Sequence, residues 1–143
     1  MKVLDLNVLL YAVNRDTVHH AQARAYVETL FTGEETIALP WTVILGFLRI
    51  ATNERLFPKA LTVQQALAVA DSWLAQPPVV GLNPGDGHWQ LLKSLLGEVG
   101  AAGNLTTDAH LAALAMENGA ELVSTDADFR RFRHLRYVNP VAG

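Results

Sequence analysis

Three aspartates of this chain stand where a fold could gather acidic side chains. Asp5 and Asp126 each follow a short apolar run typical of a buried strand, and Asp108 opens an apolar helical pattern. Because parallel strands end at the same edge of a sheet, we expect these carboxylates to lie close together. The chain has no cysteine, and clustered oxygen ligands suit hard divalent cations. The pattern predicts a metal site formed by Asp5, Asp108 and Asp126.

Polar neighbours of these aspartates could complete such a site. Asp128 lies two residues after Asp126, so the two side chains need not face the same way, and Asp128 ranks below Asp126 as a ligand. Asn7, Thr107 and Thr125 could hydrogen-bond the ligand carboxylates, although local capping explains each of them equally well. The five histidines lack the HxxxH or HxH spacing of a zinc site, so we interpret them as core or surface residues.

The elements that must position these residues alternate along the chain. Hydrophobic periodicity and capping patterns predict strands separated by helices. The predicted strands span residues 2–5, 36–39, 79–82, 121–124 and 135–138, and the predicted helices span 8–13, 19–32, 41–51, 63–74, 84–99 and 108–118. This alternation favours a parallel sheet covered on both faces by right-handed crossovers. The fold class that we expect is α/β, a three-layer α/β/α sandwich with a central parallel sheet.

Length and composition predict one domain over residues 1–143. Half of the residues are hydrophobic, and no low-complexity tract or long linker interrupts them, so the chain can bury a sizeable core. No apolar run approaches the roughly 20 residues that a membrane span requires, and a charge follows the N-terminus too closely for a signal peptide. The lack of cysteine fits a reducing compartment. We therefore expect a cytoplasmic protein without membrane contact.

The basic residues are more informative by position than by number. The formal net charge of −3 does not indicate a nucleic-acid binder, but Arg130, Arg131 and Arg133 come directly after the last acidic stretch. A solvated surface would explain any one of these arginines. Cations beside a metal-binding acidic cluster could nevertheless receive a polyanion together with the metal. Arg49 belongs to a looser basic group in the middle of the chain.

Taken in order, these stretches resemble the motifs of the PIN domain, and in particular the VapC-type toxins of bacterial toxin–antitoxin pairs. The resemblance runs from Val3 to the C-terminus, and its motifs are specific only together. They are Asp5-Leu6-Asn7-Val8-Leu9-Leu10, Asp108-Ala109-His110-Leu111-Ala112-Ala113-Leu114-Ala115 and Thr125-Asp126-Ala127-Asp128-Phe129. The resemblance implies an endoribonuclease that uses Mg²⁺ or Mn²⁺, acts as the toxin of a type II pair, is usually dimeric, and is neutralised by a cognate antitoxin.

The resemblance also assigns roles. Metal ions among the three aspartates would activate water for hydrolysis of a phosphodiester bond. The four arginines would hold the RNA backbone without reading bases. We expect single-stranded or looped RNA as substrate in preference to a duplex, because a compact acidic edge needs an accessible phosphate. RNA, a cognate antitoxin and a second copy of the chain are therefore the expected partners.

One family motif is missing. The family normally places a glutamate in the helix after the second strand, and here that helix reads Ile44-Leu45-Gly46-Phe47-Leu48-Arg49, with Gly46 in the place of the acid. In this register residue 46 faces the metal cluster, and water would occupy the place of the absent carboxylate. Either Asp5, Asp108 and Asp126 suffice for the metal, or catalysis is weakened.

Two other classes of protein compete with the ribonuclease. The first is a PIN-like module that binds RNA or protein without cutting, because the glutamate is absent. The second is a receiver domain phosphorylated on aspartate, which also gathers acids around magnesium. A receiver needs an acceptor aspartate after its central strand and a lysine near its last strand. Here Asn83 follows the third strand, and the lysines are Lys2, Lys59 and Lys93, so this class ranks well below the others.

Overall fold

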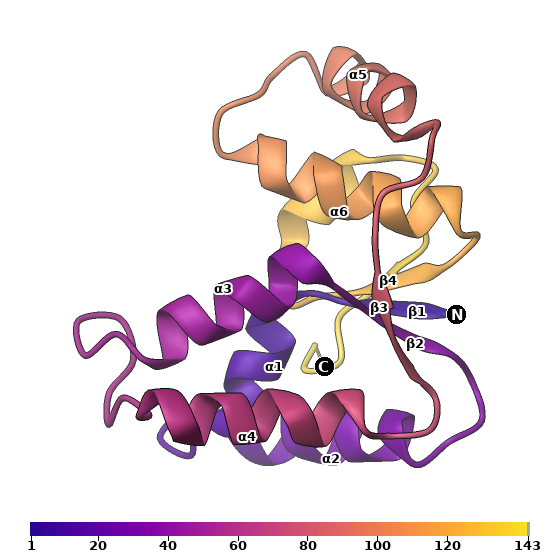
Figure 1. Cartoon of the computed structure of the whole chain (residues 1–143). Coiled ribbons are helices and arrows are strands. Elements are labelled where there is room, and N and C mark those ends of the chain that lie inside the picture. The colour runs from indigo at the N-terminus through magenta and orange to yellow at the C-terminus, as the bar shows by residue number, and fades with distance from the viewer. Residues whose placement is uncertain (143) are drawn as a thin grey trace.

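The chain alternates between short strands and helices, as the sequence predicts. A computed structural model describes residues 1–142, and Gly143, the last residue of the predicted domain, lies outside the described residues. The elements in chain order are β1 (Lys2–Leu4), α1 (Leu6–Val13), α2 (His20–Phe31), β2 (Ile37–Pro40), α3 (Trp41–Ala51), α4 (Val63–Leu74), β3 (Val79–Leu82), α5 (His88–Val99), α6 (Leu105–Glu117), β4 (Glu121–Val123), the 3₁₀ helix η1 (Ala127–Arg131) and β5 (Tyr137–Val138) (Figure 1).

The strands form one parallel sheet with the order β3-β2-β1-β4-β5. Strand β1 is central, and Val3 pairs with Ala38 on one side and with Leu122 on the other. The chain adds β2 and β3 on one side of β1 and returns to add β4 and β5 on the other. The topological switch point therefore lies between β1 and β4, where parallel α/β sheets place their ligands.

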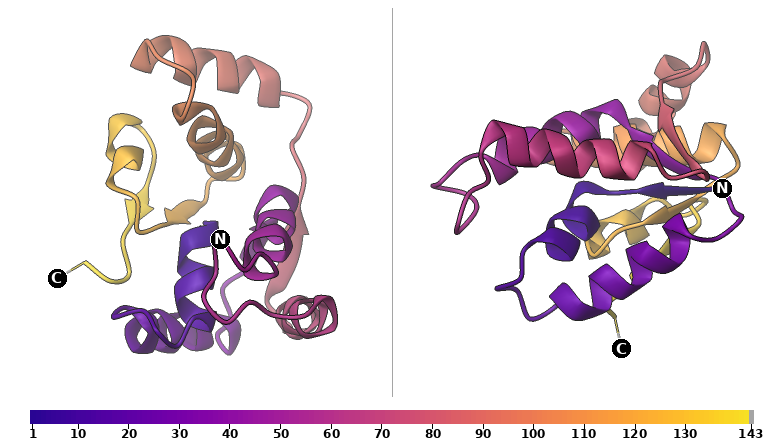
Figure 2. Two further views of the ribbon diagram at one scale, coloured as in Figure 1. Left: turned by 90° about the vertical axis from the view of Figure 1, so that its left-hand side faces the viewer. Right: turned by 60° about the horizontal axis from the view of Figure 1, so that its bottom comes forward.

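Helices cover both faces of this sheet, which confirms the three-layer sandwich. Figure 1 and the left view of Figure 2 place α1, α2 and α4 on one face, and α6 on the other with α5 stacked on its outer side. Helix α3 follows β2 directly and projects beyond the edge of the sheet. It packs there against α4 through an edge-on contact between Phe47 and Trp73, with ring centroids 4.6 Å apart.

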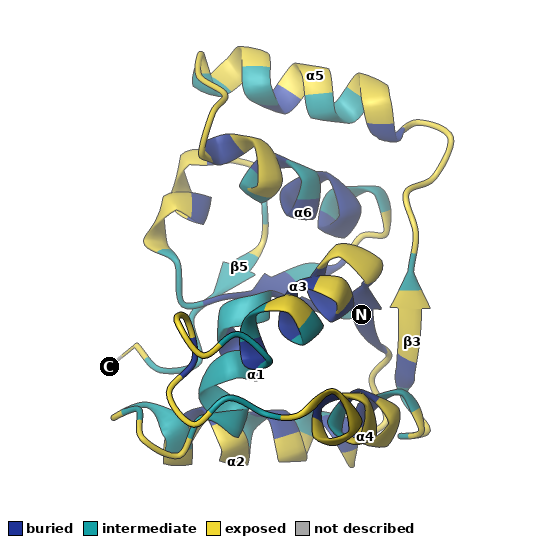
Figure 3. Ribbon diagram, turned by 60° about the vertical axis from the view of Figure 1, so that its left-hand side comes forward, coloured by how far each residue is buried: buried dark blue, intermediate teal, exposed yellow. Residues whose placement is uncertain are grey.

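The core explains why such short strands are stable. Val3, Leu4, Leu122 and Val123 on the two central strands are fully buried, because helices cover both sides of the strands. Figure 3 shows the same buried colour on the inward side of α6, while β3 at the sheet edge is largely exposed. Among the described residues, no helix combines the length and the apolar character needed to cross a membrane.

The largest errors in the predicted helix boundaries concern the starts of α5 and α6, while the other helix ends differ by at most two residues. The helix expected from residue 84 begins at His88, because residues 85–88 form a turn in which the His88 amide donates to the Gly85 carbonyl at 3.2 Å. The helix expected from Asp108 begins one turn earlier, at Leu105, whose side chain is buried. Asp108 is therefore not the N-cap residue but lies within the first turn. Helix α4 begins with a capping box formed by Thr62 and Gln65.

Candidate metal centre

The switch point between β1 and β4 brings the predicted acidic residues to one edge of the sheet. Asp5 follows β1, and its backbone amide donates to the Val123 carbonyl at 2.9 Å, which continues the pairing with β4 beyond the strand. Asp126 follows β4 and caps η1, while α6 presents Asp108 from its first turn. The convergence follows from the topology, because β1 and β4 are adjacent parallel strands that end at the same edge.

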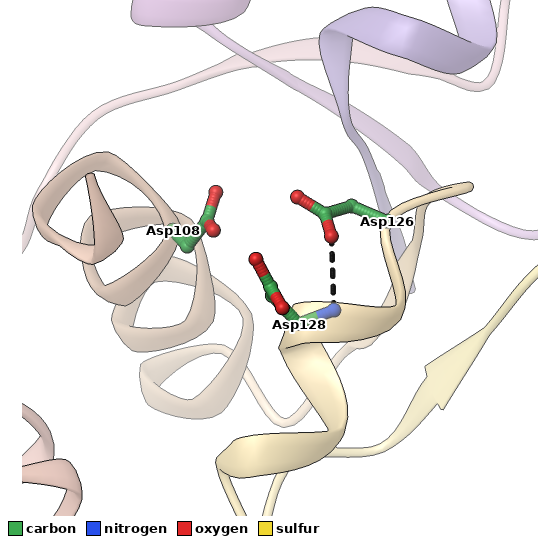
Figure 4. Close-up of side chains that lie close together, drawn as sticks. All are labelled: Asp108, Asp126 and Asp128. Atoms are coloured by element: carbon green, nitrogen blue, oxygen red, sulfur yellow. Dashed lines mark hydrogen bonds between the residues drawn. The ribbon is translucent and has the colours of Figure 1, made fainter.

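Asp108, Asp126 and Asp128 form the tightest acidic cluster. Each offers a carboxylate oxygen, and these three oxygens lie within 4.8 Å of one another (Figure 4). The turn of η1 makes Asp126 and Asp128 face the same way: Asp126 Oδ1 accepts a hydrogen bond from the Asp128 amide at 2.9 Å. Asp128 therefore belongs to the cluster together with Asp126, although the spacing of two residues did not predict this. Asp108 and Asp126 are partly exposed and Asp128 is exposed.

Asp5 lies beside this cluster but has a different environment. Its exposed fraction is 9%. Its Oδ1 accepts from the Leu6 amide at 2.7 Å, and its Oδ2 accepts from the Ser124 hydroxyl at 2.7 Å and the Asn7 amide group at 3.2 Å. Within residues 1–142, the acidic side chains whose oxygens lie close enough together to share an ion are Asp108, Asp126 and Asp128, and Asp5 is not among them.

Ser124 connects Asp5 to the segment that carries Asp126, and sequence reasoning missed it. Its side chain is fully buried. Its hydroxyl donates to Asp5 and accepts from the Asn7 side chain at 3.2 Å and from the Asp126 amide at 3.0 Å. The available signal was a small polar residue at the end of an apolar strand that neighbours β1. Ser124 was treated only as the last residue of that strand.

The other predicted supporting residues differ in their contacts. Asn7 bonds to Asp5 and Ser124, and its Oδ1 accepts from the Thr125 amide at 3.1 Å. Thr125 takes part through its backbone, since its carbonyl also accepts from Asn139 at 3.4 Å. Thr107 is exposed, and its side chain makes no hydrogen bond within the described part of the chain.

The aspartate side chains at this edge of the sheet repel one another electrostatically. Burial, followed by the charges of Asp126, Asp5 and Asp128, raises the pKa of the Asp108 carboxyl from 3.8 to about 6. Burial also raises the pKa of Asp5, against the opposing effect of the Ser124 and Leu6 hydrogen bonds. Like charges that raise one another's pKa would be relieved by a bound cation. The donor set of carboxylate oxygens without cysteine or histidine fits Mg²⁺ or Mn²⁺.

Gly46 lies close to the side chain of the residue that follows Asp5. A Cβ atom added to Gly46 would lie 2.8 Å from Cδ2 of Leu6. A larger residue at position 46 would therefore require the end of the Leu6 side chain to shift, and the expectation that water takes the place of the absent carboxylate stays a prediction. Because Gly46 is buried on α3, its lack of a side chain allows α3 and α1 to approach closely.

The candidate RNA-binding arginines fall into two places. Arg130 and Arg131 end η1, directly after the acidic cluster, and are exposed. Arg133 follows them and pairs with Glu98 at the end of α5, with Nε and Oε1 3.2 Å apart. Arg49 lies on α3 instead, where it lines a shallow apolar groove with α4.

The chain is similar to proteins of one family over its whole length. The PIN domain model matches residues 2–135. Ribonuclease VapC43 of Mycobacterium tuberculosis is 42% identical over 143 residues, which cover 100% of this chain and 97% of that protein. Ribonuclease VapC37 of the same species is 42% identical over 142 residues, or 99% of each chain.

The fold is also found in solved structures. The structure of VapBC2 from Rickettsia felis bound to a DNA fragment from its promoter matches with a TM-score of 0.71 and 20% identity, covering 96% of this chain and 97% of that one. At this identity the likeness concerns the fold alone. Together with the family model and the full-length relatives, it shows that the chain belongs to the PIN-domain family, within its VapC group.

Proposed function

We propose that this protein is a Mg²⁺-dependent endoribonuclease and the toxin of a type II toxin–antitoxin pair. The observation that carries the proposal is the convergence of Asp5, Asp108, Asp126 and Asp128 at the switch point, in a chain 42% identical over its full length to ribonucleases of the VapC group. A divalent ion at this edge would be Mg²⁺ or Mn²⁺, since carboxylate oxygens are the ligands offered.

The residues of the chain suit hydrolysis of a phosphodiester bond. The chemistry that a bound divalent cation supplies is a water of lowered pKa and neutralisation of charge on the scissile phosphate. The four carboxylates would hold that cation, and the exposure of Asp128 and partial exposure of Asp126 would leave the cluster open to a substrate phosphate. Ser124 and Asn7 fix the loop that carries Asp126. These fixed groups reduce the reorganisation required during reaction.

Arginines beside the cluster would bind the RNA backbone. Arg130 and Arg131 are exposed at the end of η1, two and three residues after Asp128. Contacts to phosphates position RNA without specifying its sequence, so we assign these residues a role in affinity. Arg133 and Arg49 are weaker candidates, because the first is paired with Glu98 and the second lies in the groove between α3 and α4.

The expected protein partners are a cognate antitoxin and a second copy of the chain, in the cytoplasm. Apolar side chains remain uncovered on α3 and α5: Trp41 is 45% exposed, Leu45 61% and Trp89 62%. The third tryptophan, Trp73, is buried in the core. Exposed apolar groups of this kind mark surfaces that bind other proteins. A monomer in sedimentation velocity at micromolar concentration would contradict the homodimer.

Purified protein and defined RNA test the activity directly. We expect cleavage with Mg²⁺ or Mn²⁺, loss of cleavage with a chelator, and recovery when the metal is returned. Asp108→Asn should abolish cleavage. Asp86→Asn provides a matched control, because it removes the same charge from an exposed position at the start of α5. Metal-independent cleavage, or equal cleavage by the Asp108 variant, would contradict the proposal.

A second candidate function is an RNA- or protein-binding module that does not cut. The observation that favours it is that α3, where the family usually has a glutamate, contains no acidic residue and has Gly46 in that place, so that α3 brings no carboxylate to the site. This candidate predicts that RNA binds with unchanged affinity when metal is added and that no product forms at any Mg²⁺ concentration. The same cleavage assay, combined with RNA-binding measurements, separates the two functions.

A further inference from the structure

A polar pocket lies at the C-terminal end of α6, where the segment after β3 enters α5. It has a volume of about 310 Å³ and is lined by residues of both segments, Asn83, Gly85, Asp86, Gly87, Glu117 and Asn118. Two of these residues are acidic and none is basic, so the pocket favours a cation. Asp108 lies in the first turn of α6 and Glu117 is its last residue, about 13.5 Å further along the helix axis. The pocket is therefore separate from the acidic edge.

His88 directs a nitrogen atom without a hydrogen-bond partner toward this pocket. Only 9% of His88 is exposed, and its buried Nδ1 makes no hydrogen bond among the described residues. Oε1 of Glu117 lies 3.3 Å from Nδ1 but outside the geometry of a hydrogen bond. A buried polar atom without a partner is destabilising, so Nδ1 is an atom for which a ligand would be favourable.

The other atoms around His88 and Glu117 are already fixed. Nε2 of His88 lies 2.8 Å from Nδ1 of His110 on α6, and Oε1 of Glu117 accepts from the Gly85 amide at 3.2 Å. When Nε2 of His88 donates its proton to His110, the lone pair of His88 is on Nδ1 and faces the Glu117 carboxylate. That arrangement is repulsive unless a cation lies between the two groups. A histidine that binds a metal through one nitrogen usually donates its other N–H to a fixed acceptor, and His110 provides one.

The spacing of these two ligand atoms matches a tetrahedral metal site. Zn²⁺ binds histidine nitrogen at about 2.0–2.1 Å and carboxylate oxygen at about 2.0–2.2 Å, which places tetrahedral neighbours about 3.3–3.5 Å apart. Nδ1 of His88 and Oε1 of Glu117 are 3.3 Å apart. Within residues 1–142, no third histidine, aspartate or glutamate offers an atom within 4.8 Å of both. Water and the side-chain oxygens of Asn83 and Asn118 would complete the coordination.

We propose that His88 Nδ1 and Glu117 Oε1 bind Zn²⁺, or a similar divalent transition-metal ion, in the pocket between α5 and α6. Imidazole together with carboxylate suits Zn²⁺ better than Mg²⁺, which takes oxygen ligands and keeps several waters. The ion joins the first residue of α5 to the last residue of α6, so it holds the outer helix against the one that covers the sheet (Figure 1). This site is independent of the proposed ribonuclease activity.

Calorimetric titration of Zn²⁺ into protein with excess Mg²⁺, which competes for the oxygen ligands of the acidic edge, tests the site. We expect one Zn²⁺ ion to bind per chain. Glu117→Gln keeps the shape of the side chain, and His88→Gln removes Nδ1 while keeping a polar group near Nε2. Each should weaken Zn²⁺ binding about tenfold or more. Glu34→Gln and His134→Gln change exposed residues and are the matched controls with unchanged affinity. If the buried His88 substitution prevents folding, Glu117→Gln alone decides the result.

Asp126→Asn separates this site from the acidic edge. Its Zn²⁺ affinity should equal that of the wild type, while Glu117→Gln should keep full Mg²⁺-dependent RNA cleavage. In NMR spectra, Zn²⁺ should shift the amide signals of residues 85–88 and 117–118 before those of the acidic edge. Equal Zn²⁺ affinity of Glu117→Gln and wild type, or loss of Zn²⁺ binding in Asp126→Asn, would overturn the proposal. Absence of saturable Zn²⁺ binding by the wild type would also overturn it, and each of these results would leave the proposed ribonuclease activity standing.

Discussion

The acidic edge contains two groups of the same residue type in opposite surroundings. Asp5 is buried, and both of its oxygens accept hydrogen bonds from Leu6, Asn7 and Ser124. The trio of Asp108, Asp126 and Asp128 is open to solvent and contains one internal hydrogen bond, from the Asp128 amide to Asp126. Residue type alone therefore does not distinguish a carboxylate that organises the site from one that is available to a ligand.

The difference has a physical basis. A buried carboxylate is tolerated when donors surround it, because otherwise its desolvation is costly. Three donors satisfy Asp5 and also fix its direction. The trio has few donors and several neighbouring negative charges, so its favourable state requires a cation from outside the chain. We call these the buried half, Asp5 with Asn7 and Ser124, and the open half, Asp108 with Asp126 and Asp128.

Asp126→Asn should have the largest effect, because Asp126 belongs to the open half and is tied to the buried half through its amide. We expect RNA cleavage to fall by about 100-fold or more, as several kcal/mol of charge stabilisation are lost with the metal. The metal-free protein should melt at an equal or higher temperature, since repulsion is relieved. Cleavage rates and thermal melting measure the two effects, and wild-type activity in this variant would remove Asp126 from the site.

Ser124→Ala tests the buried half. It removes one hydroxyl that makes three hydrogen bonds, and it leaves the buried Asp5 Oδ2 with one donor fewer. We expect the free energy of unfolding to fall by about 1–3 kcal/mol, the range for an unsatisfied buried polar group. Ser124→Thr retains the hydroxyl and should recover cleavage at least in part. Equal stability of Ser124→Ala and wild type in denaturant titrations would show that the network is not needed.

Much of the acidic edge as a whole could be predicted from the sequence. Apolar runs before Asp5 and Asp126 identified adjacent parallel strands, and the periodicity after Asp108 identified a helix that reaches the same edge. The division into two halves could not be predicted, because it depends on the rotation of side chains within turns. Asp128 joins the cluster through the turn of η1, and Ser124 bonds Asp5 across 119 residues of sequence. Neither relation leaves a local pattern.

Contacts between elements were also invisible in the sequence. The space beside Gly46 is set by the approach of α3 to α1, and the local sequence of α3 contains no information about Leu6. The histidines provide another example: His88 and His110 form a ring-nitrogen contact of 2.8 Å between α5 and α6, although they are 22 residues apart. Sequence spacing rules detect ligands on one element and miss pairs formed by packing two elements.

Gly46→Glu tests whether α3 can add a further carboxylate ligand to the open half. Alone, the substitution should tighten Mn²⁺ binding only slightly, because its Cβ would lie 2.8 Å from Leu6 Cδ2 and the Leu6 side chain must first shift. Combined with Leu6→Ala it gains space, and we expect affinity about tenfold above that of Leu6→Ala, from one more anionic ligand. Calorimetry compares the variants. Binding in the single variant as tight as in the double variant would mean that Leu6 moves readily and that the space is not closed.

The pH dependence of stability tests the charge balance of the open half. The folded-state pKa of Asp108 is raised from 3.8 to about 6, so the folded protein binds more protons than the unfolded chain between these values. The free energy of unfolding of metal-free protein should therefore fall as pH rises through this window and level off above it. Asp108→Asn should reduce this slope, and the part that remains belongs to Asp5, whose pKa is also raised.

With saturating Mg²⁺, the free energy of unfolding should instead rise as pH rises through this window, since the metal favours the ionised carboxylates and competes with protons. Melting temperatures across this pH range, with and without Mg²⁺, make the comparison. A metal-free protein whose stability rises through the window would contradict the raised pKa and with it the crowding of the trio.

The smallest expected effect concerns the arginines next to the open half. Arg131 is exposed and has no ion pair among the described residues, whereas Arg133 is paired with Glu98. If Arg131 contacts an RNA phosphate, Arg131→Ala should weaken binding and lower the slope of log affinity against log salt by about 1. Arg133→Ala should change the slope less, because its charge is already partly neutralised by Glu98. Binding is measured in Asp126→Asn protein, in which RNA stays intact, over a series of salt concentrations. Equal slopes for both variants and the parent would show that RNA approaches the acidic cluster from another side, across α3 or α5, and that the basic end of η1 is a solvated surface.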